Sequence, residues 1–186
     1  MKEFRYLYGT KRAVESNLSR ITKHVGSGLV TLSACRQSLT EDENLKRSEL
    51  LVAELRKLGY GYIPLVGSYI EEETGEPATE HSFLIPYPNK RELSFEEMVF
   101  ELQVVANSFN QDSILVVNQG KGYLLYSDGH QDPVGSFNLD NNTSSPYFST
   151  LAKGNHRNRK WVFEGVLSKP ETLLTLWGSS RDGEIF

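Results

Sequence analysis

Polar side chains gather where a predicted strand leads into a predicted helix. Ser33 and Arg36 lie at the end of the strand candidate, and Asn44 and Arg47 follow at helical spacing. At about 100° per residue, Asn44 and Arg47 share an angular sector with the leucines further along that helix, which places them on its inner side. A helix N-terminus and a planar guanidinium both suit a phosphate or a carboxylate. We therefore expect an anion pocket built on Arg36 and Arg47.

An alternative for the same residues is structural. Buried arginines are usually paired, so Arg47 and Asn44 would hydrogen-bond loop carbonyls or pair with a carboxylate such as Glu80, and thereby fix the edge of the sheet.

Other chemistry-bearing residues do not assemble into a catalytic set. His81 lies on a predicted strand, but no second histidine in a matching setting would serve as its acid or base partner. Cys35 has no acid or histidine placed near it by the sequence. The segment 128–132 (DGHQD) has metal-friendly side chains, yet turn chemistry explains it better. We expect no metal and no cofactor, and the catalytic residues stay unassigned.

A basic segment near residue 160 is the second candidate contact surface. Arg157, Arg159 and Lys160 precede Trp161 without an intervening acid. Such a stretch suits contact with phosphates, with the indole stacked on a base, so local nucleic-acid or partner contact is one interpretation. The other is a solvated loop that leads into a strand, with Trp161 in the core.

The composition limits the class of protein. The 186-residue chain is 38% hydrophobic and 24% charged, typical of one globular domain over residues 1–186. Its net charge of -4 argues against a chain-wide nucleic-acid footprint. No apolar run approaches the roughly 18 residues of a membrane span, and one cysteine favours a reducing cytoplasm. We expect a cytoplasmic protein without a membrane contact, and composition leaves its oligomeric state open.

Three helices are predicted from apolar periodicity and end signals. The first covers Lys11–Val25 and ends at Gly26, and the other two begin with capping boxes. The capping boxes are Thr40 with Glu43, in a helix that ends at Gly59, and Ser94 with Glu97, in a helix that Asn110 closes.

Strand candidates rich in β-branched and aromatic residues separate these helices. They are Leu29–Ala34, Tyr60–Ile70, Ser82–Tyr87, Ser113–Val117 and Tyr123–Tyr126, the last two joined by a hairpin at residues 118–120. The order predicts an α+β fold with a ferredoxin-like split β-α-β core over residues 28–126, with helices on one face of a mixed or antiparallel sheet. Residues 1–27 would add a helix. Residues 127–186 would form a loop-rich extension with a strand at 161–163 and a short helix.

The core resembles a family of small bacterial and bacteriophage α+β domains of unknown function. The resemblance rests on residues 31–35 (TLSAC), on Asn44, Arg47 and Glu80, on 82–84 (SFL) and on 110–115 (NQDSIL). It covers roughly residues 28–126 and implies a compact domain, often phage-encoded, with no activity to carry over. It adds Glu80 and Gln111 to the polar set formed with Asn44 and Arg47.

These observations favour a non-enzymatic binding module, phage-encoded and acting in the host cytoplasm. Its target would be a host protein or a phosphorylated, nucleotide-type small molecule. The expected ligand-binding residues are Ser33, Arg36, Asn44, Arg47, Glu80 and Gln111. One alternative is an enzyme on nucleotides or phosphodiesters, with Arg36 and Arg47 for charge and Glu80 or His81 for proton transfer. The other is a virion structural protein.

Overall fold

The described part of the chain is an α+β fold, as the sequence predicts. A computed structural model describes residues 24–70, 77–88, 92–138, 148–151 and 160–164. Two helices, α2 (Glu41–Lys57) and α3 (Phe95–Ser108), accompany the strands in these ranges. The strands are β1 (Leu29–Ser33), β2 (Ile63–Ile70), β3 (Pro77–Pro86), β4 (Ser113–Asn118), β5 (Lys121–Tyr126), β6 (Gln131–Asn138), β7 (Phe148–Leu151) and β8 (Lys160–Glu164). No described helix has the length and apolar character needed to cross a membrane.

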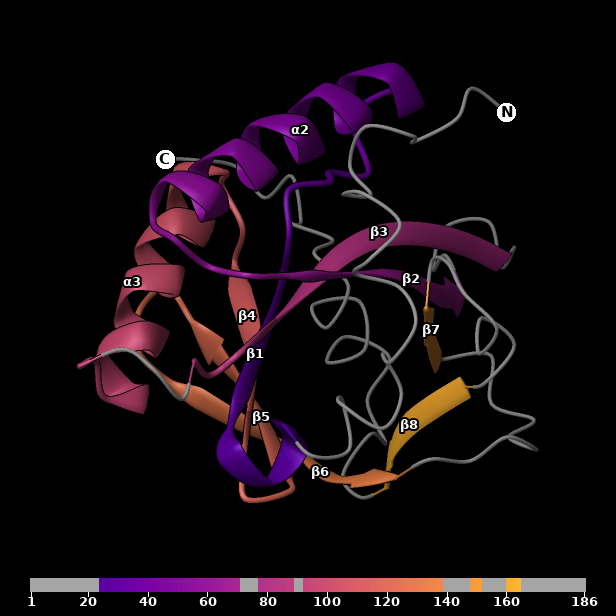
Figure 1. Cartoon of the computed structure of the whole chain (residues 1–186). Coiled ribbons are helices and arrows are strands. Elements are labelled where there is room, and N and C mark those ends of the chain that lie inside the picture. Colours follow the sequence, from indigo (N-terminus) through magenta and orange to yellow (C-terminus); the bar gives the residue numbers. More distant parts are fainter. Residues whose placement is uncertain (1–23, 71–76, 89–91, 139–147, 152–159, 165–186) are drawn as a thin grey trace.

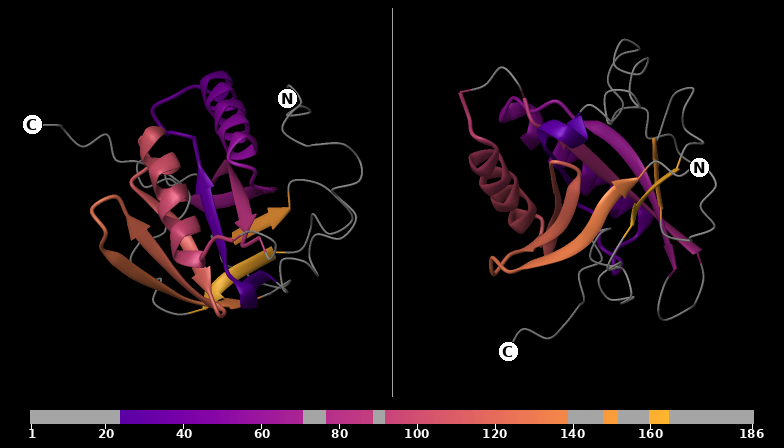
Figure 2. Two further views of the ribbon diagram at one scale, coloured as in Figure 1. Left: turned by 60° about the vertical axis from the view of Figure 1, so that its left-hand side comes forward. Right: turned by 90° about the horizontal axis from the view of Figure 1, so that it is seen from below.

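Four of the five predicted strands lie side by side with the two helices packed on them. The strands pair side by side in the order β4, β1, β3, β2, and every neighbouring pair is antiparallel. Helix α2 connects β1 to β2 and α3 connects β3 to β4, so each helix joins two strands with one other strand between them. Both helices cover the same face of these strands (Figures 1 and 2).

The prediction of a loop-rich segment after residue 126 is wrong within the described residues. Strand β6 pairs with β5 and β8, and β7 pairs with β2 and β8. These contacts close the sheet into a barrel in the order β1, β3, β2, β7, β8, β6, β5, β4. The strand predicted at 161–163 is part of β8, whereas the predicted final helix lies outside the described residues.

Both helices with predicted capping boxes are confirmed. The Thr40 side chain accepts a hydrogen bond from the Glu43 backbone N–H, and the Glu43 carboxylate binds back to the Thr40 backbone. Ser94 and Glu97 repeat this arrangement at the start of α3. Gly59 adopts a φ of 77° just after α2, which is a conformation that glycine tolerates best.

The N-terminal helix ends later than predicted. Residues 24–27 are helical, and Gly28, not Gly26, adopts a φ of 106°. The Gly28 N–H donates to the His24 carbonyl at 2.8 Å. A Cβ at Gly28 would stand 2.5 Å from the Phe95 ring of α3. Both the positive φ and this close packing therefore favour glycine at position 28. The rest of the predicted helix lies outside the described residues.

The two faces of the strands bury different kinds of side chain. Val30 and Leu32 of β1, and Phe83 and Ile85 of β3, pack with α2 and α3 in the main hydrophobic cluster. Since side chains alternate along a strand, Thr31 and the neighbours of these residues point into the barrel. The buried apolar residues of that interior are Leu29, Leu65, Leu84, Leu115, Val117 and Leu124.

Candidate functional site

One end of the barrel interior is lined by buried polar side chains, which we call the polar end. It comprises Ser33 of β1, Glu80 and Ser82 of β3, Gln111, and Ser113 of β4, all with at most 6% exposure. Ser33 lies directly opposite Ser82 in the β1–β3 register. Glu80 lies opposite Gly67, so β2 places no side chain beside the carboxyl. The antiparallel register therefore brings polar residues from three strands to one level of the barrel.

Glu80 is the electrostatic centre of the polar end. Among the described residues it is the only buried one that carries an acidic or basic side chain. Burial raises the pKa of the Glu80 carboxyl well above its ordinary value, and a side-chain hydrogen bond with Ser33 opposes this only in part. Burial at the polar end thus favours the protonated, neutral carboxyl. A bound cation would reverse that preference, because an opposite charge stabilises the carboxylate.

Cys35 joins the polar end to α2. Its Sγ lies 3.8 Å from Ser48 Oγ and 3.6 Å from the His81 carbonyl oxygen, and its backbone N–H donates to Ser33 Oγ at 3.0 Å. Burial, followed by the charge of Glu80, raises the pKa of the Cys35 thiol. The thiol therefore stays protonated near neutral pH, which makes it a poor nucleophile.

Three buried acceptor atoms of the polar end have no hydrogen-bond partner. They are Glu80 Oε1, Ser82 Oγ and Gln111 Oε1. Buried polar groups in folded proteins are nearly always paired, so an unpaired group that persists calls for an explanation. Three such atoms at one end of a barrel are the arrangement expected of a ligand site that is complete only when the ligand is bound.

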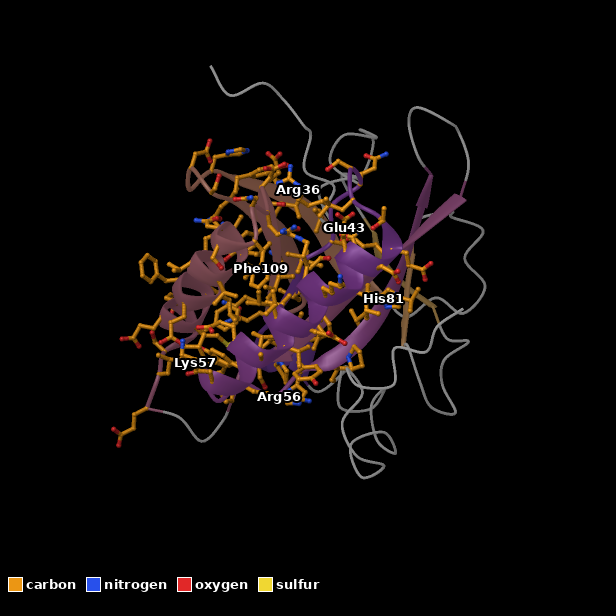
Figure 3. The ribbon with its side chains drawn as sticks, turned by 90° about the horizontal axis from the view of Figure 1, so that it is seen from above. Arg36, Glu43, Arg56, Lys57, His81 and Phe109 are labelled. Atoms are coloured by element: carbon orange, nitrogen blue, oxygen red, sulfur yellow. The ribbon has the colours of Figure 1, made fainter. Side chains whose placement is uncertain are left out.

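The predicted arginines bind backbone carbonyls next to polar-end residues, after β1 and at the C-terminal end of α3. Arg47 donates from Nε to the Ala34 carbonyl at 2.6 Å and from Nη2 to the Phe109 carbonyl. Arg36 Nη1 donates to the Asn110 carbonyl at 3.2 Å. Figure 3 shows Arg36 and Phe109 at the same end of the helix pair. The last turn of α3 has no basic residue of its own, so the two guanidinium groups supply the positive charge that a helix C-terminus favours.

The Asn44 side chain hydrogen-bonds the backbone of the loop before α2. Its Oδ1 accepts the Arg36 backbone N–H at 2.8 Å, and its Nδ2 donates to the Arg36 carbonyl at 2.9 Å and the Leu39 carbonyl at 3.3 Å. This two-way pairing fixes the path from β1 into α2.

The structure does not bring together the four residues expected to act in the enzyme alternative. Glu80 points into the barrel, whereas His81 takes the opposite face of β3, toward the N-terminal half of α2 (Figure 3). Burial lowers the pKa of the His81 imidazole. Arg36 and Arg47 donate to carbonyls at the C-terminal end of α3, and Arg47 also donates to the Ala34 carbonyl after β1.

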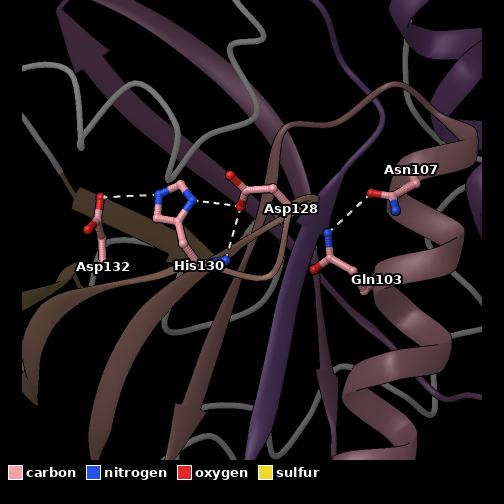
Figure 4. Close-up of polar contacts among 5 residues, drawn as sticks. All are labelled: Gln103, Asn107, Asp128, His130 and Asp132. Atoms are coloured by element: carbon pink, nitrogen blue, oxygen red, sulfur yellow. Dashed lines mark hydrogen bonds and ion pairs between the residues drawn. The ribbon is translucent and has the colours of Figure 1, made fainter.

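The segment 128–132 covers the turn after β5 and the first two residues of β6. Asp128 Oδ1 accepts hydrogen bonds from the His130 backbone N–H at 3.0 Å and lies 2.6 Å from His130 Nδ1 (Figure 4). Asp132 lies 4.0 Å from the other ring nitrogen, and the Tyr126 ring stacks on His130. Within the described ranges, no group of three or more histidine, cysteine, aspartate or glutamate residues is arranged to hold a metal ion.

The second predicted contact surface is only partly described. Arg157 and Arg159 lie outside the described residues, and Lys160 and Trp161 belong to β8 without a description of their side chains. Ser82 and Ser113, in contrast, are polar-end residues that the sequence reasoning did not select. The available signal was the alternation of Glu80 and Ser82, which places both on one face of a strand.

Comparison with known proteins gives one family. The model of the S-adenosylmethionine lyase family matches residues 30–162, from β1 into β8 and well over half of the chain. No curated protein matches the chain. The family name denotes an enzyme, so the prediction of a non-enzymatic binding module is wrong. The chain belongs to the S-adenosylmethionine lyase family.

Proposed function

We propose that this protein is an enzyme that cleaves S-adenosylmethionine at the polar end of the barrel. The observation that carries the proposal is Glu80, a carboxyl that is buried, has an unpaired oxygen and has no cation among the influences on its pKa. A site with one buried acid and no buried base suits a positively charged substrate. S-adenosylmethionine carries a permanent sulfonium charge and an ammonium group.

The chemistry of this substrate needs little from the protein. When a carbon–sulfur bond of the sulfonium breaks, its electron pair moves to sulfur and a neutral thioether leaves. The carbon that loses this pair can form a new bond to the substrate's own carboxylate oxygen, which gives a lactone and balances the step within one molecule. A lyase makes this cleavage without water or an oxidant, so positioning and exclusion of water are the main tasks of the site. The closed barrel with its apolar layer of Leu65, Leu84 and Leu115 provides such a dry interior beside Glu80.

We assign Glu80 the role of countercharge and assign Arg36, Asn44 and Arg47 the role of holding the site in shape. Their side chains bind the backbone that connects β1 to α2 and the end of α3. Ser33 links Glu80 to the backbone that these residues hold. Its Oγ accepts a hydrogen bond from the Cys35 N–H, and its side chain also interacts with Glu80.

The test is turnover by the purified full chain. S-adenosylmethionine is incubated with the protein alone, and mass spectrometry follows loss of the substrate and appearance of the thioether. We expect cleavage without an added cosubstrate, and loss of cleavage in Glu80→Gln. Glu101→Gln is the matched control, since Glu101 lies on α3 and accepts from the Tyr60 hydroxyl at 2.6 Å, away from the barrel interior. A folded protein that leaves S-adenosylmethionine unchanged would contradict the proposal.

A further inference from the structure

We propose that Glu80, Ser82 and Gln111, hereafter the acceptor cluster, bind the primary ammonium group of the substrate. The inference rests on the proposed function and adds which part of S-adenosylmethionine the polar end recognises. Three unpaired acceptor atoms carry it: Glu80 Oε1, Ser82 Oγ and Gln111 Oε1.

Glu80 and Ser82 lie on β3, and Gln111 lies just before β4, with β1 paired between these two strands. Glu80 and Ser82 are two residues apart on β3 and point to the same side. Ser82 is opposite Ser33 of β1, whose Oγ accepts the Cys35 N–H. The Cys35 carbonyl in turn accepts from Gln111 Nε2 at 2.9 Å. Hydrogen bonds and strand register therefore connect the acceptor cluster from one member to the next.

The amide of Gln111 can be oriented in one way only. Its partner, the Cys35 carbonyl, is an acceptor, so the side-chain nitrogen must face it. The side-chain oxygen then points away from that carbonyl, and it is buried with no donor near it. An amide fixed by its nitrogen and unpaired at its oxygen presents an acceptor to a ligand.

The chemistry of the cluster selects an ammonium. The cluster offers a carboxylate, a hydroxyl and an amide oxygen, and a primary ammonium has a positive charge and three N–H donors to match them. A sulfonium has the charge but no donor. A phosphate or carboxylate would keep Glu80 protonated and would find no buried cation among the described residues to balance its charge.

The experiment compares S-adenosylmethionine with its analogue that lacks the amino group. Binding is followed by thermal shift and cleavage by kcat/KM, in the wild type, Ser82→Ala and Gln111→Met. We expect each substitution to lower kcat/KM for S-adenosylmethionine about 10- to 100-fold, the range for hydrogen bonds to a charged group. In the wild type, kcat/KM for the des-amino analogue should be lower than for S-adenosylmethionine by at least the same factor. The substitutions should then lower kcat/KM for the analogue only a little further.

Gln103→Met is the matched control. Gln103 also has a buried, unpaired Oε1, but it lies on α3 and donates to Asn107 (Figure 4). The wild-type preference for the amino group should survive in this variant.

The outcomes separate this inference from the proposed function. Equal kcat/KM for the two compounds in the wild type would overturn the inference and leave the lyase activity standing. An equal loss for both compounds in Gln111→Met would also overturn it, because Gln111 would then act only through the Cys35 carbonyl. Binding that requires the amino group and Gln111, without any cleavage, would support the ammonium site and contradict the proposed function.

Discussion

The polar side chains on the two sides of β1 and β3 differ in whether their polar atoms have hydrogen-bond partners. On the helix-covered side, Arg47 and Asn44 have hydrogen-bond partners at both ends of their polar groups. Inside the barrel, Glu80, Ser82 and Gln111 are more deeply buried and each keeps an unpaired acceptor. Gln103 of α3 is also buried with one unpaired oxygen, but among the described residues only the polar end gathers three such atoms. The contrast indicates that the helix side holds the fold and that the barrel interior holds the site.

The largest expected effect separates activity from stability at Glu80. Glu80→Gln should lower kcat/KM for S-adenosylmethionine by about 100-fold or more, because the substrate cation loses its buried countercharge. The melting temperature near neutral pH should stay the same or rise, since the variant buries no ionisable group. Calorimetry beside the turnover assay checks both results. A variant that unfolds but cleaves at the wild-type rate would place Glu80 among the structural residues.

Arg47 should show the reverse pattern. Arg47→Met removes the donors of the Ala34 and Phe109 carbonyls, so we expect a loss of about 3 kcal/mol in the free energy of unfolding. Urea titration measures this loss. Arg36→Met removes the longer bond to the Asn110 carbonyl from a half-buried position, and we expect a smaller loss of about 1 kcal/mol. The comparison between the two faces fails if Arg47→Met keeps its stability and loses cleavage.

The pH dependence of Glu80 should have opposite signs for activity and stability. The neutral carboxyl must lose its proton to pair with a cation, so kcat/KM should rise up to about tenfold per pH unit until the raised Glu80 pKa is passed. Stability should fall over the window between the ordinary carboxyl pKa and the raised folded pKa, because the unfolded chain ionises first. The slope of that fall is at most about 1.4 kcal/mol per pH unit.

Glu80→Gln gives the control for this prediction. Both pH slopes should disappear in the variant, as followed by kcat/KM profiles and by urea titrations at several pH values. Retention of the stability slope would assign it to another group.

The smallest effect tests the helix side alone. Thr40→Ala removes the side-chain acceptor of the α2 capping box, and we expect a loss of about 1 kcal/mol in the free energy of unfolding. The kcat/KM of the folded protein should change little. A fall in kcat/KM comparable to that of Glu80→Gln would show that the start of α2 takes part in the site.

Local signals in the sequence predicted the elements whose ends and faces are fixed locally. The capping boxes gave the starts of α2 and α3, and the turn at Gln119 and Gly120 joins β4 to β5 as predicted. Strand β6 escaped prediction because Pro133 and Gly135 interrupt it and Val134 is its one buried hydrophobic residue among those described. Barrel closure depends on pairings between distant segments, such as β2 with β7, and no local pattern specifies these.

The candidate site was predicted in part. Ser33, Glu80 and Gln111 were selected, and they lie together at the polar end. Ser82 was missed as a site residue because its alternation with Glu80 points to a site only when its neighbours across the sheet are known. The arginines were selected because of their charge. The sequence alone does not distinguish a guanidinium that binds a ligand from one that donates to the backbone carbonyls at the end of α3.

The most direct test of the central claim measures protons released when substrate binds. The wild type is mixed rapidly with S-adenosylmethionine in weakly buffered solution containing a pH indicator, at a pH below the raised pKa of Glu80. We predict a burst that approaches one proton per protein molecule before steady-state cleavage, and its loss in Glu80→Gln but not in Glu101→Gln. Cleavage without a burst in the wild type, or an unchanged burst in Glu80→Gln, would contradict the claim that the buried carboxyl receives the substrate cation.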